Sequence, residues 1–383
     1  MQIRSPTAFA FAAHFVIVRL MTTYLADAID LQTIRRVLIT KLRHHGDVLL
    51  ASPVFQTLKN HAPHLELDAL VYHDTREMLT GHPAIAEVHS IDRQWKRQGL
   101  EAQAGNEWRL FKSLQARRYD LIVHLTEHHR GVWLCRLLGP RYSVAQNLPD
   151  KGQLWQRSFT HRYPHPQATP RHTVELNLDA LRRIGVQALP EERRLVLIPG
   201  EAAEQRVGEL LKAHEVSERQ FIHLHPTSRW LFKTWPVERV AELCDALHAQ
   251  GERVVLTSAH DAREKQMVAE IFSRTTLPPV DLSGQLSLKE LAALTARARL
   301  FIGVDSAPMH IAAAMQTPVV ALFGPSGELE WGPWMVRHRL ITSNHSCRPC
   351  GNDGCGGGKI SECLTVLPVN RVLAAANELL GGP

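Results

Sequence analysis

The sequence predicts an α/β fold built from two doubly wound halves, each with its own parallel sheet. Short apolar runs alternate with amphipathic helical stretches along nearly the whole chain, which is the pattern of consecutive βαβ units. The chain has 383 residues, more than a single hydrophobic core usually organises, so two domains are expected. A hydrophobic content of 44% with 21% charged residues is typical of a globular protein.

Residues 34–190 are expected to form the first domain. Its predicted strands are Val37–Leu42, Leu65–Val71, Val88–Ile91, Leu121–Leu125 and Tyr142–Ala145. Helices are predicted between the strands, notably Glu107–Arg118 and Arg130–Leu138. A further helix over 171–185 ends at Gly185, a residue type that suits the position after a helix. The polar, proline-containing stretch Val186–Arg194 is the expected linker.

Residues 191–365 repeat the alternation and are expected to form the second domain. The predicted strands are Phe221–Leu224, Arg253–Thr257, Val280–Leu282, Leu300–Val304 and Val319–Phe323. Residues 366–383 contain a last helix, Val369–Leu380, which is expected to pack back onto the first domain.

The first 33 residues are expected to be a dispensable extension, with Met21 as an alternative start. Their apolar run Ala8–Val18 faintly resembles the core of a signal peptide, but Arg19 follows it where small residues would mark a cleavage site. No apolar run in the chain reaches the roughly 18 residues needed to span a bilayer.

Positive charge is concentrated in the first domain. Residues 34–190 hold 22 Lys and Arg against 14 Asp and Glu, whereas residues 191–383 hold 20 against 22. A broad positive surface favours an anionic partner at an anionic membrane, and the alternative is a solvated basic face without a function. Nucleic acid is not expected, because the chain has neither a basic run interleaved with aromatic residues nor a known binding module.

The most informative stretch is FIGVDSAPMHIAAAMQTPVVALFG, Phe301–Gly324. It predicts a buried strand, a polar turn at Asp305 and Ser306, a helix to about Met315, and a second buried strand. The helix N-terminus then lies at the carboxyl edge of the sheet, a geometry that suits a diphosphate. The turn has neither the GxGxxG of a dinucleotide fold nor the GKS or GKT of a P-loop. The alternative is that Asp305 and Ser306 only cap the helix.

A second segment, HLHPTSRWLFKTWP, places Thr227, Ser228 and two cations at the end of another apolar strand. Hydroxyl groups and cations at this position also suit a phosphorylated ligand, with Lys233 as a point charge for a diphosphate. Taken alone, Lys233 is better explained as a solvated loop lysine, and Trp235 as a core residue.

A third segment, KLRHHGDVLLASPV, follows the first predicted strand. The strand breaks at His44, His45 and Gly46, and a helix from Asp47 to about His61 is predicted. Asp47 has two interpretations. A carboxylate at the start of a helix is most often an N-cap, but it can also be a general base that takes a proton from a hydroxyl nucleophile.

Together and in this order, the three segments resemble the ADP-heptose:lipopolysaccharide heptosyltransferases of glycosyltransferase family nine, from about Arg35 to Leu380. HTVELNLDALRRIG (His172–Gly185) and CRPCGNDGCGGGKISECL look more narrowly like the heptosyltransferase III branch, which adds the side heptose of the inner core. The resemblance implies the glycosyltransferase-B architecture, two Rossmann-like domains facing a central cleft.

The resemblance also implies roles for individual residues. ADP-L-glycero-D-manno-heptose would bind the second domain, Asp47 would deprotonate the acceptor hydroxyl for an inverting attack, and Lys233 would neutralise the departing ADP. The implied donor-binding residues are Thr227, Ser228, Lys233, Asp261, Leu286, Asp305, Ser306, Ala307 and His310, and those on the acceptor side are Lys41, Arg43 and Gly46. Position 307 is commonly glycine in the family, so the Ala307 methyl group puts close contact with the diphosphate in doubt.

The implied acceptor is a lipid A-core glycolipid, met by a peripheral enzyme at the cytoplasmic face of the inner membrane, and a monomer is favoured. No DxD-type motif is evident, so a divalent ion is not expected to be required. Heptosyltransferase I or II activity, on Kdo or the first heptose, is an alternative. Two other classes are a non-catalytic lipopolysaccharide-core binding protein and a nucleotide-dependent oxidoreductase. The missing glycine fingerprint argues against the oxidoreductase.

Four cysteines form a cluster with the spacing C-x2-C-x4-C-x7-C, at Cys347, Cys350, Cys355 and Cys363. Structural zinc, an iron–sulfur cluster, reduced thiols and disulfides are all compatible with this spacing, and a cytosolic location disfavours disulfides. Cys135 and Cys244 lie on apolar helical stretches and are expected in the core.

Overall fold

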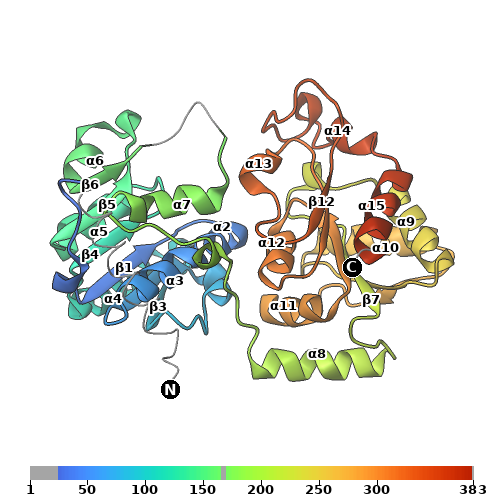
Figure 1. Cartoon of the computed structure of the whole chain (residues 1–383), viewed down its shortest axis with the longest axis horizontal. Coiled ribbons are helices and arrows are strands. Elements are labelled where there is room, and N and C mark those ends of the chain that lie inside the picture. The colour runs from blue at the N-terminus through green and yellow to red at the C-terminus, as the bar shows by residue number, and fades with distance from the viewer. Residues whose placement is uncertain (1–24, 165–169, 382–383) are drawn as a thin grey trace, which may run out of the picture. The chain divides into compact units, whose positions relative to one another are not determined.

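The computed structural model describes residues 25–164 and 170–381, which form two compact units (Figure 1). Unit 1 contains residues up to Arg76, Pro83–Thr169 and Val174–Arg193, and unit 2 contains Glu77–His82, Pro170–Thr173 and Arg194 onward. The predicted α/β class with two parallel sheets is confirmed. Within the described part of the chain, no helix is both long and apolar enough to cross a membrane.

Unit 1 is built on a six-stranded sheet with the order β3-β2-β1-β4-β5-β6. Every neighbouring pair is parallel, and Val37 of β1 pairs with Leu67 of β2 and Leu121 of β4. The strands are β1 (Arg36–Thr40), β2 (Glu66–Tyr72), β3 (Glu87–Ile91), β4 (Leu121–His124), β5 (Tyr142–Gln146) and β6 (His161–Tyr163).

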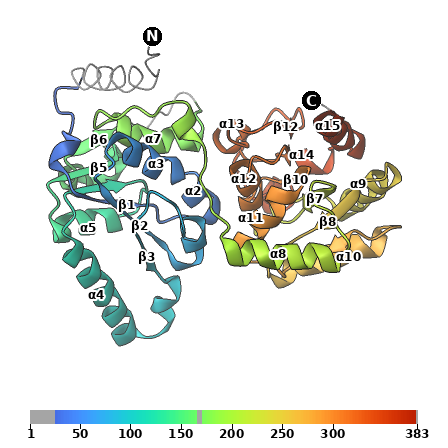
Figure 2. The ribbon, with the colours of Figure 1, turned by 60° about the horizontal axis from the view of Figure 1, so that its bottom comes forward.

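The helices of unit 1 follow the strands in βαβ fashion (Figure 2). They are α2 (His45–Leu49), α3 (Ser52–His61), α4 (Leu100–Arg117), α5 (Arg130–Leu138), α6 (Gly152–Ser158) and α7 (Thr173–Arg182), with 3-10 turns η2 (Leu31–Thr33), η3 (His73–Met78), η4 (Arg93–Arg97), η5 (Pro149–Lys151) and η6 (Glu191–Arg193). Leu114 of α4 and Val132 of α5 join Leu38 and Ile122 in one core cluster, so both helices cover the same face of the sheet.

Unit 2 repeats this topology with the strand order β12-β11-β10-β7-β8-β9, again with parallel neighbours. Its strands are β7 (Phe221–His225), β8 (Arg253–Leu256), β9 (Val280–Asp281), β10 (Leu300–Val304), β11 (Val319–Leu322) and β12 (His338–Ile341). The central strands β7 and β10 are buried along their whole length, as expected for parallel strands covered on both faces.

The longer helices of unit 2 lie on both faces of this sheet. They are α8 (Glu201–Ala213), α9 (Val237–Ala249), α10 (Ala262–Arg274), α11 (Leu288–Arg297), α12 (Ala307–Ala314) and α15 (Val369–Gly381), with shorter segments η7 (Leu231–Lys233), α13 (Glu328–Trp331), η8 (Cys355–Gly357) and α14 (Glu362–Thr365). Side chains of α9, α10 and α15 share one core cluster, and those of α8 and α11 share another.

The expected packing of the last helix on the first domain is wrong. Val372, Ala376 and Leu379 of α15 are buried in the core cluster of unit 2, together with Val240 and Leu300. The apolar stripe of α15 therefore completes the core of the domain that precedes it in the chain.

The predicted N-terminal extension ends earlier in the chain than residue 33. Residues 1–24 lie outside the described part of the chain, but Asp27 forms an ion pair with Arg183 at 2.5 Å, and the Ile29 amide donates to the Ile184 carbonyl at 3.1 Å. Ile29 is buried. Residues from Asp27 on are therefore packed on unit 1.

Gly131 allows α5 to start directly over β4. A Cβ atom at this position would lie 2.3 Å from the buried ring of His124, whose Nε2 is 3.0 Å from the His128 carbonyl oxygen. The Nδ1 atom of the same ring lies 2.5 Å from Thr40 Oγ1, so the imidazole has no room to move aside. The close approach of helix and strand depends on this glycine.

We therefore expect Gly131→Ala to lower the free energy of unfolding by about 1–3 kcal/mol, the usual cost of overpacking a core. Gly105→Ala in α4 is the matched control, because its Cβ would meet nothing within 4 Å. This control should raise the free energy of unfolding by up to about 1 kcal/mol, because alanine favours the helix more than glycine does. Urea unfolding followed by circular dichroism measures both changes, and equal stabilities of the two variants would contradict the close packing.

Candidate active site

The loops after β7 and β10 meet at the carboxyl edge of the unit 2 sheet. β7 and β10 are neighbours, and Gly303 is in register with His225 at the ends of the two strands. A Cβ at Gly303 would lie 2.7 Å from the Phe301 ring and 2.9 Å from the His225 carbonyl oxygen, so a side chain would push the strands apart. Lys233 and Asp305 lie on the loops that leave this edge.

An ion pair joins these two loops. Lys233 Nζ lies 2.5 Å from Asp305 Oδ2, and the side chains are 22% and 7% exposed. The predicted alternative that Asp305 and Ser306 cap α12 is wrong, since Asp305 is held by Lys233 and Ser306, the N-cap residue, makes no side-chain capping bond. Instead, the Ser306 hydroxyl donates to the Val304 carbonyl at 3.2 Å.

The N-terminus of α12 therefore has no side-chain cap next to a nearly buried carboxylate–ammonium pair. Ala307 is the first residue of α12, and His310 is buried one turn further on. A helix N-terminus with an adjacent ammonium group is an arrangement that binds diphosphate oxygens.

A hollow of about 540 Å³ opens beside Lys233. Its lining combines aromatic rings with carboxylates and a short turn, and consists of Trp230, Phe232, Lys233, Pro325, Ser326, Gly327, Glu330, Trp331, Pro349, Cys350, Gly351 and Asp353. Asp261 and Leu286 do not line this hollow.

The structure places Asp261 and Leu286 beyond β8 and β9. Asp261 is the N-cap of α10 and accepts hydrogen bonds from the amides of Arg263 at 2.9 Å and Glu264 at 3.4 Å. Its bond with the Arg263 side chain holds the pKa of this carboxyl below its ordinary value. Leu286 is half-buried against the core cluster that contains Leu282.

Thr227 is fully buried, and its hydroxyl donates to Glu264 Oε2 at 2.6 Å. The expected bond from this hydroxyl to a phosphate oxygen is therefore not available in this arrangement. Ser228 Oγ accepts from the Trp230 amide at 3.2 Å and is part of the same loop. Glu264 also accepts from the Ala259 amide at 3.1 Å, so it ties the loops after β7 and β8 together.

Sequence analysis missed Glu264, although a signal for it exists. Asp261 and Glu264 have the three-residue spacing of a helix start with an acidic residue in the first turn, and here the acidic side chain is turned inward. Its hydrogen-bond partner, Thr227, lies on a loop 37 residues away in the chain, and the local spacing of residues does not identify such a distant partner.

Neutral imidazoles support the loop after β7 from inside. Thr257 Oγ1 lies 2.7 Å from His223 Nε2 and 2.8 Å from His225 Nδ1, and His223 Nδ1 lies 2.9 Å from Thr295 Oγ1. Burial lowers the pKa of His225 to about 3 and that of His223 well below its ordinary value. Both rings therefore stay uncharged at neutral pH, so the charge at this edge belongs to the Lys233 pair and the groups around it.

In unit 1, Asp47 lies in the first turn of α2, after β1. The N-cap of this helix is His44, so the interpretation of Asp47 as the N-cap is wrong. The Asp47 side chain is 12% exposed and lies 3.6 Å from Arg43 Nε. Gly46 lies inside the same helix and has no positive φ, and the predicted single helix to His61 is broken into α2 and α3 at Leu50.

Lys41 is buried beneath this turn. Its Nζ donates to the Leu125 carbonyl at 3.0 Å and to Asn177 Oδ1 at 2.9 Å, while Asn177 Nδ2 donates to the Leu50 carbonyl at 3.0 Å. Burial lowers the pKa of Lys41 to about 8, against the opposing effect of the Asp47 carboxylate. Lys41 is therefore a structural cation within unit 1, and among the three predicted acceptor-side residues Arg43, 54% exposed, is the accessible charge.

Asn177 is a second residue that sequence analysis missed. It lies on α7 and holds both Lys41 and the backbone of the α2–α3 turn. The helix is visible in the sequence, but the pairing joins positions 136 residues apart.

The four clustered cysteines lie in unit 2, and Cys350 lines the hollow. Cys347, Cys350 and Cys355 are exposed, Cys363 is buried, and all are free thiols. Burial raises the pKa of Cys363, and the other three cysteines act in the same direction. Cys135 and Cys244 are buried, as predicted, and burial raises the pKa of each to about 12.

In the part of the chain that the structure describes, no three of the four cysteines have sulfur atoms within 4.8 Å of one another. Among the described residues, one group of three candidate ligands has its ligand atoms within 4.8 Å of one another, and it consists of Asp68, Glu87 and His89. Asp68 in that group already accepts from Arg117 Nε at 2.6 Å and from the Tyr119 hydroxyl at 2.7 Å, which explains it as an ion-pair network. The metal alternatives for the cysteine cluster stay predictions from the spacing of the four residues.

The chain is similar in sequence to known glycosyltransferases. The family model of glycosyltransferase family 9 (heptosyltransferase) matches residues 107–360. Lipopolysaccharide heptosyltransferase 3 of Escherichia coli is 38% identical over 342 residues, covering 88% of this chain and 97% of that protein.

Solved structures show the same fold. A family 9 glycosyl transferase from Veillonella parvula superimposes with a TM-score of 0.78 at 23% identity, covering 93% of this chain and 99% of that one. ADP-heptose LPS heptosyltransferase II of E. coli gives a TM-score of 0.70 at 21% identity, covering 91% and 98%. The fold is thus the glycosyltransferase-B fold of these enzymes.

Proposed function

Because this chain belongs to glycosyltransferase family 9, the heptosyltransferases, we propose that it moves L-glycero-D-manno-heptose from ADP-heptose to a heptose of the lipopolysaccharide inner core. The chain is a lipopolysaccharide core heptosyltransferase, and the finer acceptor assignment rests on its similarity to lipopolysaccharide heptosyltransferase 3. We place the reaction at the cytoplasmic face of the inner membrane, because the donor of the family is a cytosolic nucleotide sugar.

The Lys233–Asp305 pair is the observation that carries the proposed donor site. It lies next to the uncapped N-terminus of α12, so the ammonium group and the helix dipole both attract the diphosphate. As the bond between the heptose C1 and the phosphate oxygen breaks, the electron pair leaves with ADP. Lys233 neutralises that developing charge, and Asp305 holds Lys233 in place.

Asp47 is the proposed general base. The acceptor oxygen attacks C1 from the face opposite the departing ADP, so the configuration is inverted, and its proton passes to the Asp47 carboxylate. Arg43 is the accessible cation beside Asp47 and would attract an anionic acceptor. No step requires a metal, and we propose that the cysteine cluster holds free thiols.

A product analysis tests the acceptor assignment. The full chain is offered ADP-heptose with defined core oligosaccharides that end at Kdo, at the first heptose, or further along the heptose chain. We expect turnover only on the last of these, with a side-branch heptose in the product. Transfer to Kdo or to the first heptose would instead make it a heptosyltransferase I or II, and binding without turnover on all three would make it a core-binding protein.

Asp47→Asn should lower the turnover number by roughly 10²–10⁴, the usual effect of losing an acid–base group, with ADP affinity nearly unchanged. Asp150→Asn, at an exposed position of unit 1, is the matched control and should leave turnover unchanged. Steady-state kinetics and calorimetry with ADP measure the two quantities. A variant that keeps its rate and loses thermal stability would assign Asp47 a structural role.

Lys233→Ala should weaken ADP binding by about 10- to 100-fold, because a charged hydrogen bond to the diphosphate is lost. Lys212→Ala on α8 removes an exposed lysine of the same unit and is the control. Calorimetric titration with ADP gives both dissociation constants. Equal values for the parent and Lys233→Ala would rule out the diphosphate role.

A further inference from the structure

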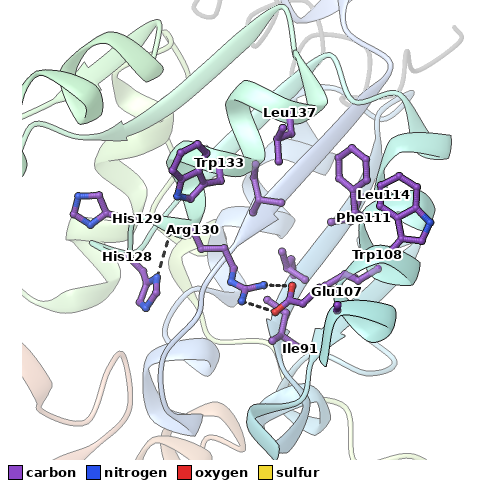
Figure 3. A pocket seen from close by; sticks show the side chains of 14 residues that line it. Ile91, Glu107, Trp108, Phe111, Leu114, His128, His129, Arg130, Trp133 and Leu137 are labelled. Carbon is purple, nitrogen blue, oxygen red and sulfur yellow. Dashed lines mark hydrogen bonds and ion pairs between the residues drawn. The ribbon is translucent and has the colours of Figure 1, made fainter. Parts of the chain in front are cut away.

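A large apolar groove lies on unit 1 between α4 and α5 (Figure 3). We call it the α4–α5 groove. It has a volume of about 610 Å³ and is lined by Leu70, Ile91, Ala104, Glu107, Trp108, Leu110, Phe111, Leu114, His128, His129, Arg130, Trp133, Leu134 and Leu137. The proposed donor and base residues are not part of it.

The rim of the groove exposes large apolar side chains. Trp108 on α4 is 58% exposed, and Trp133 and Leu137 on α5 are 55% and 60% exposed. Leu100, at the start of α4, is 86% exposed. Leu100, Ala104, Trp108 and Phe111 follow one another at helical spacing, so α4 presents a continuous apolar stripe. An apolar patch of this kind on a soluble domain marks a surface that contacts something else.

The carboxylate and the guanidinium group that line the groove, Glu107 and Arg130, are paired with each other. Arg130 Nη1 and Nη2 donate to the two carboxylate oxygens of Glu107, each at 2.7 Å, as the dashed lines in Figure 3 show. This bidentate pair connects the two helices and cancels its own charge. The groove therefore binds an occupant mainly through apolar contacts. Because Arg130 and Glu107 neutralise each other, this pair does not attract a charged ligand.

The segment of the chain that forms the apolar rim is rich in cations. Residues 93–141, which include η4, α4 and α5, hold 10 Lys and Arg against 4 Asp and Glu, most of the positive excess of the first domain. Lys96, Arg97, Arg109, Lys112, Arg136 and Arg141 are exposed in this segment. Lys112 Nζ lies 4.8 Å from the centre of the Trp108 ring, so cation and indole are side by side.

Exposed indoles and leucines with adjacent lysines and arginines are the composition of surfaces that lie in a membrane interface. The apolar side chains enter the boundary between headgroups and acyl chains, and the cations meet anionic headgroups. A second copy of the chain is a poorer occupant, because a two-fold contact through this face would bring two strongly positive segments together.

We propose that the rim of the α4–α5 groove is the surface by which this enzyme docks onto an anionic lipid bilayer. This rests on the proposed function in one respect, that the acceptor is a membrane-anchored glycolipid. Docking concentrates the enzyme where the acceptor is, and the chemistry of transfer does not depend on it.

Vesicle binding by the full-length chain tests the docking surface. Co-sedimentation is measured with vesicles of phosphatidylcholine alone and with about one third phosphatidylglycerol. Trp108→Ser with Leu137→Ser should weaken binding to the anionic vesicles by at least about tenfold, because two exposed apolar side chains that enter the bilayer interface on docking are lost. Leu277→Ser with Val366→Ser removes side chains of unit 2 that are 60% and 53% exposed, and should leave binding unchanged.

Charge reversal tests the electrostatic half of the proposal. Arg109→Glu with Lys112→Glu should also weaken binding to anionic vesicles, by more than the about fivefold expected for each lost cation, and should have little effect on neutral vesicles. Equal binding of all variants, or equal binding of the parent to both vesicle types, would overturn the proposal. Sedimentation showing that the parent is a dimer and Trp108→Ser/Leu137→Ser a monomer would assign the groove to self-association instead.

Transfer to a water-soluble, delipidated core oligosaccharide separates this proposal from the proposed function. We expect the groove variants to match the parent enzyme on that acceptor and to lose rate on acceptor embedded in vesicles. Normal vesicle binding without turnover would reject the function and leave the docking surface in place. Normal turnover without vesicle binding would reject the docking surface alone.

Discussion

The ion pair between Lys233 and Asp305 is the contact on which the proposed donor site depends. Parallel strands place all their carboxyl ends at one edge of a sheet, so residues 72 positions apart in the chain arrive at the same place. Because both side chains are largely shielded from solvent, each charge is stabilised by the other while no ligand is present. The pairing also keeps the Asp305 carboxylate away from the capping position of α12, so the helix N-terminus remains available to an anion.

The strands that end at this edge of the unit 2 sheet are closely packed. Gly303 lets β10 lie against β7 at a point where a methyl group would be 2.9 Å from the His225 carbonyl oxygen. The uncharged imidazoles of His223 and His225 form hydrogen bonds with the hydroxyl groups of Thr257, which follows β8, and Thr295, which lies on α11. In unit 1 the buried ammonium group of Lys41 holds the segment that follows β1. Lys41 donates to Asn177, and Asn177 donates to the backbone just after the helix that carries Asp47. In both units, buried polar groups hold the loops that carry the proposed site residues.

The sequence predicted the central strands well, because continuous apolar runs such as Leu300–Val304 are unambiguous in a βαβ pattern. It missed β6 and β12, the edge strands His161–Tyr163 and His338–Ile341, whose polar residues conceal the pattern. Among site residues, the positions of Lys233 and Asp305 after their strands could be predicted. The hydrogen bond from the buried Thr227 hydroxyl to Glu264 could not be predicted, because the local spacing of residues does not reveal a partner from another βα unit. The same holds for Lys41 and Asn177.

An experimental structure of this chain with ADP bound tests the central claim most directly. We expect a diphosphate oxygen within hydrogen-bonding distance of Lys233 Nζ, about 2.7–3.2 Å, with the phosphates facing the N-terminus of α12. An ADP molecule whose phosphates lie out of reach of Lys233, with the Lys233–Asp305 pair unchanged, would contradict it.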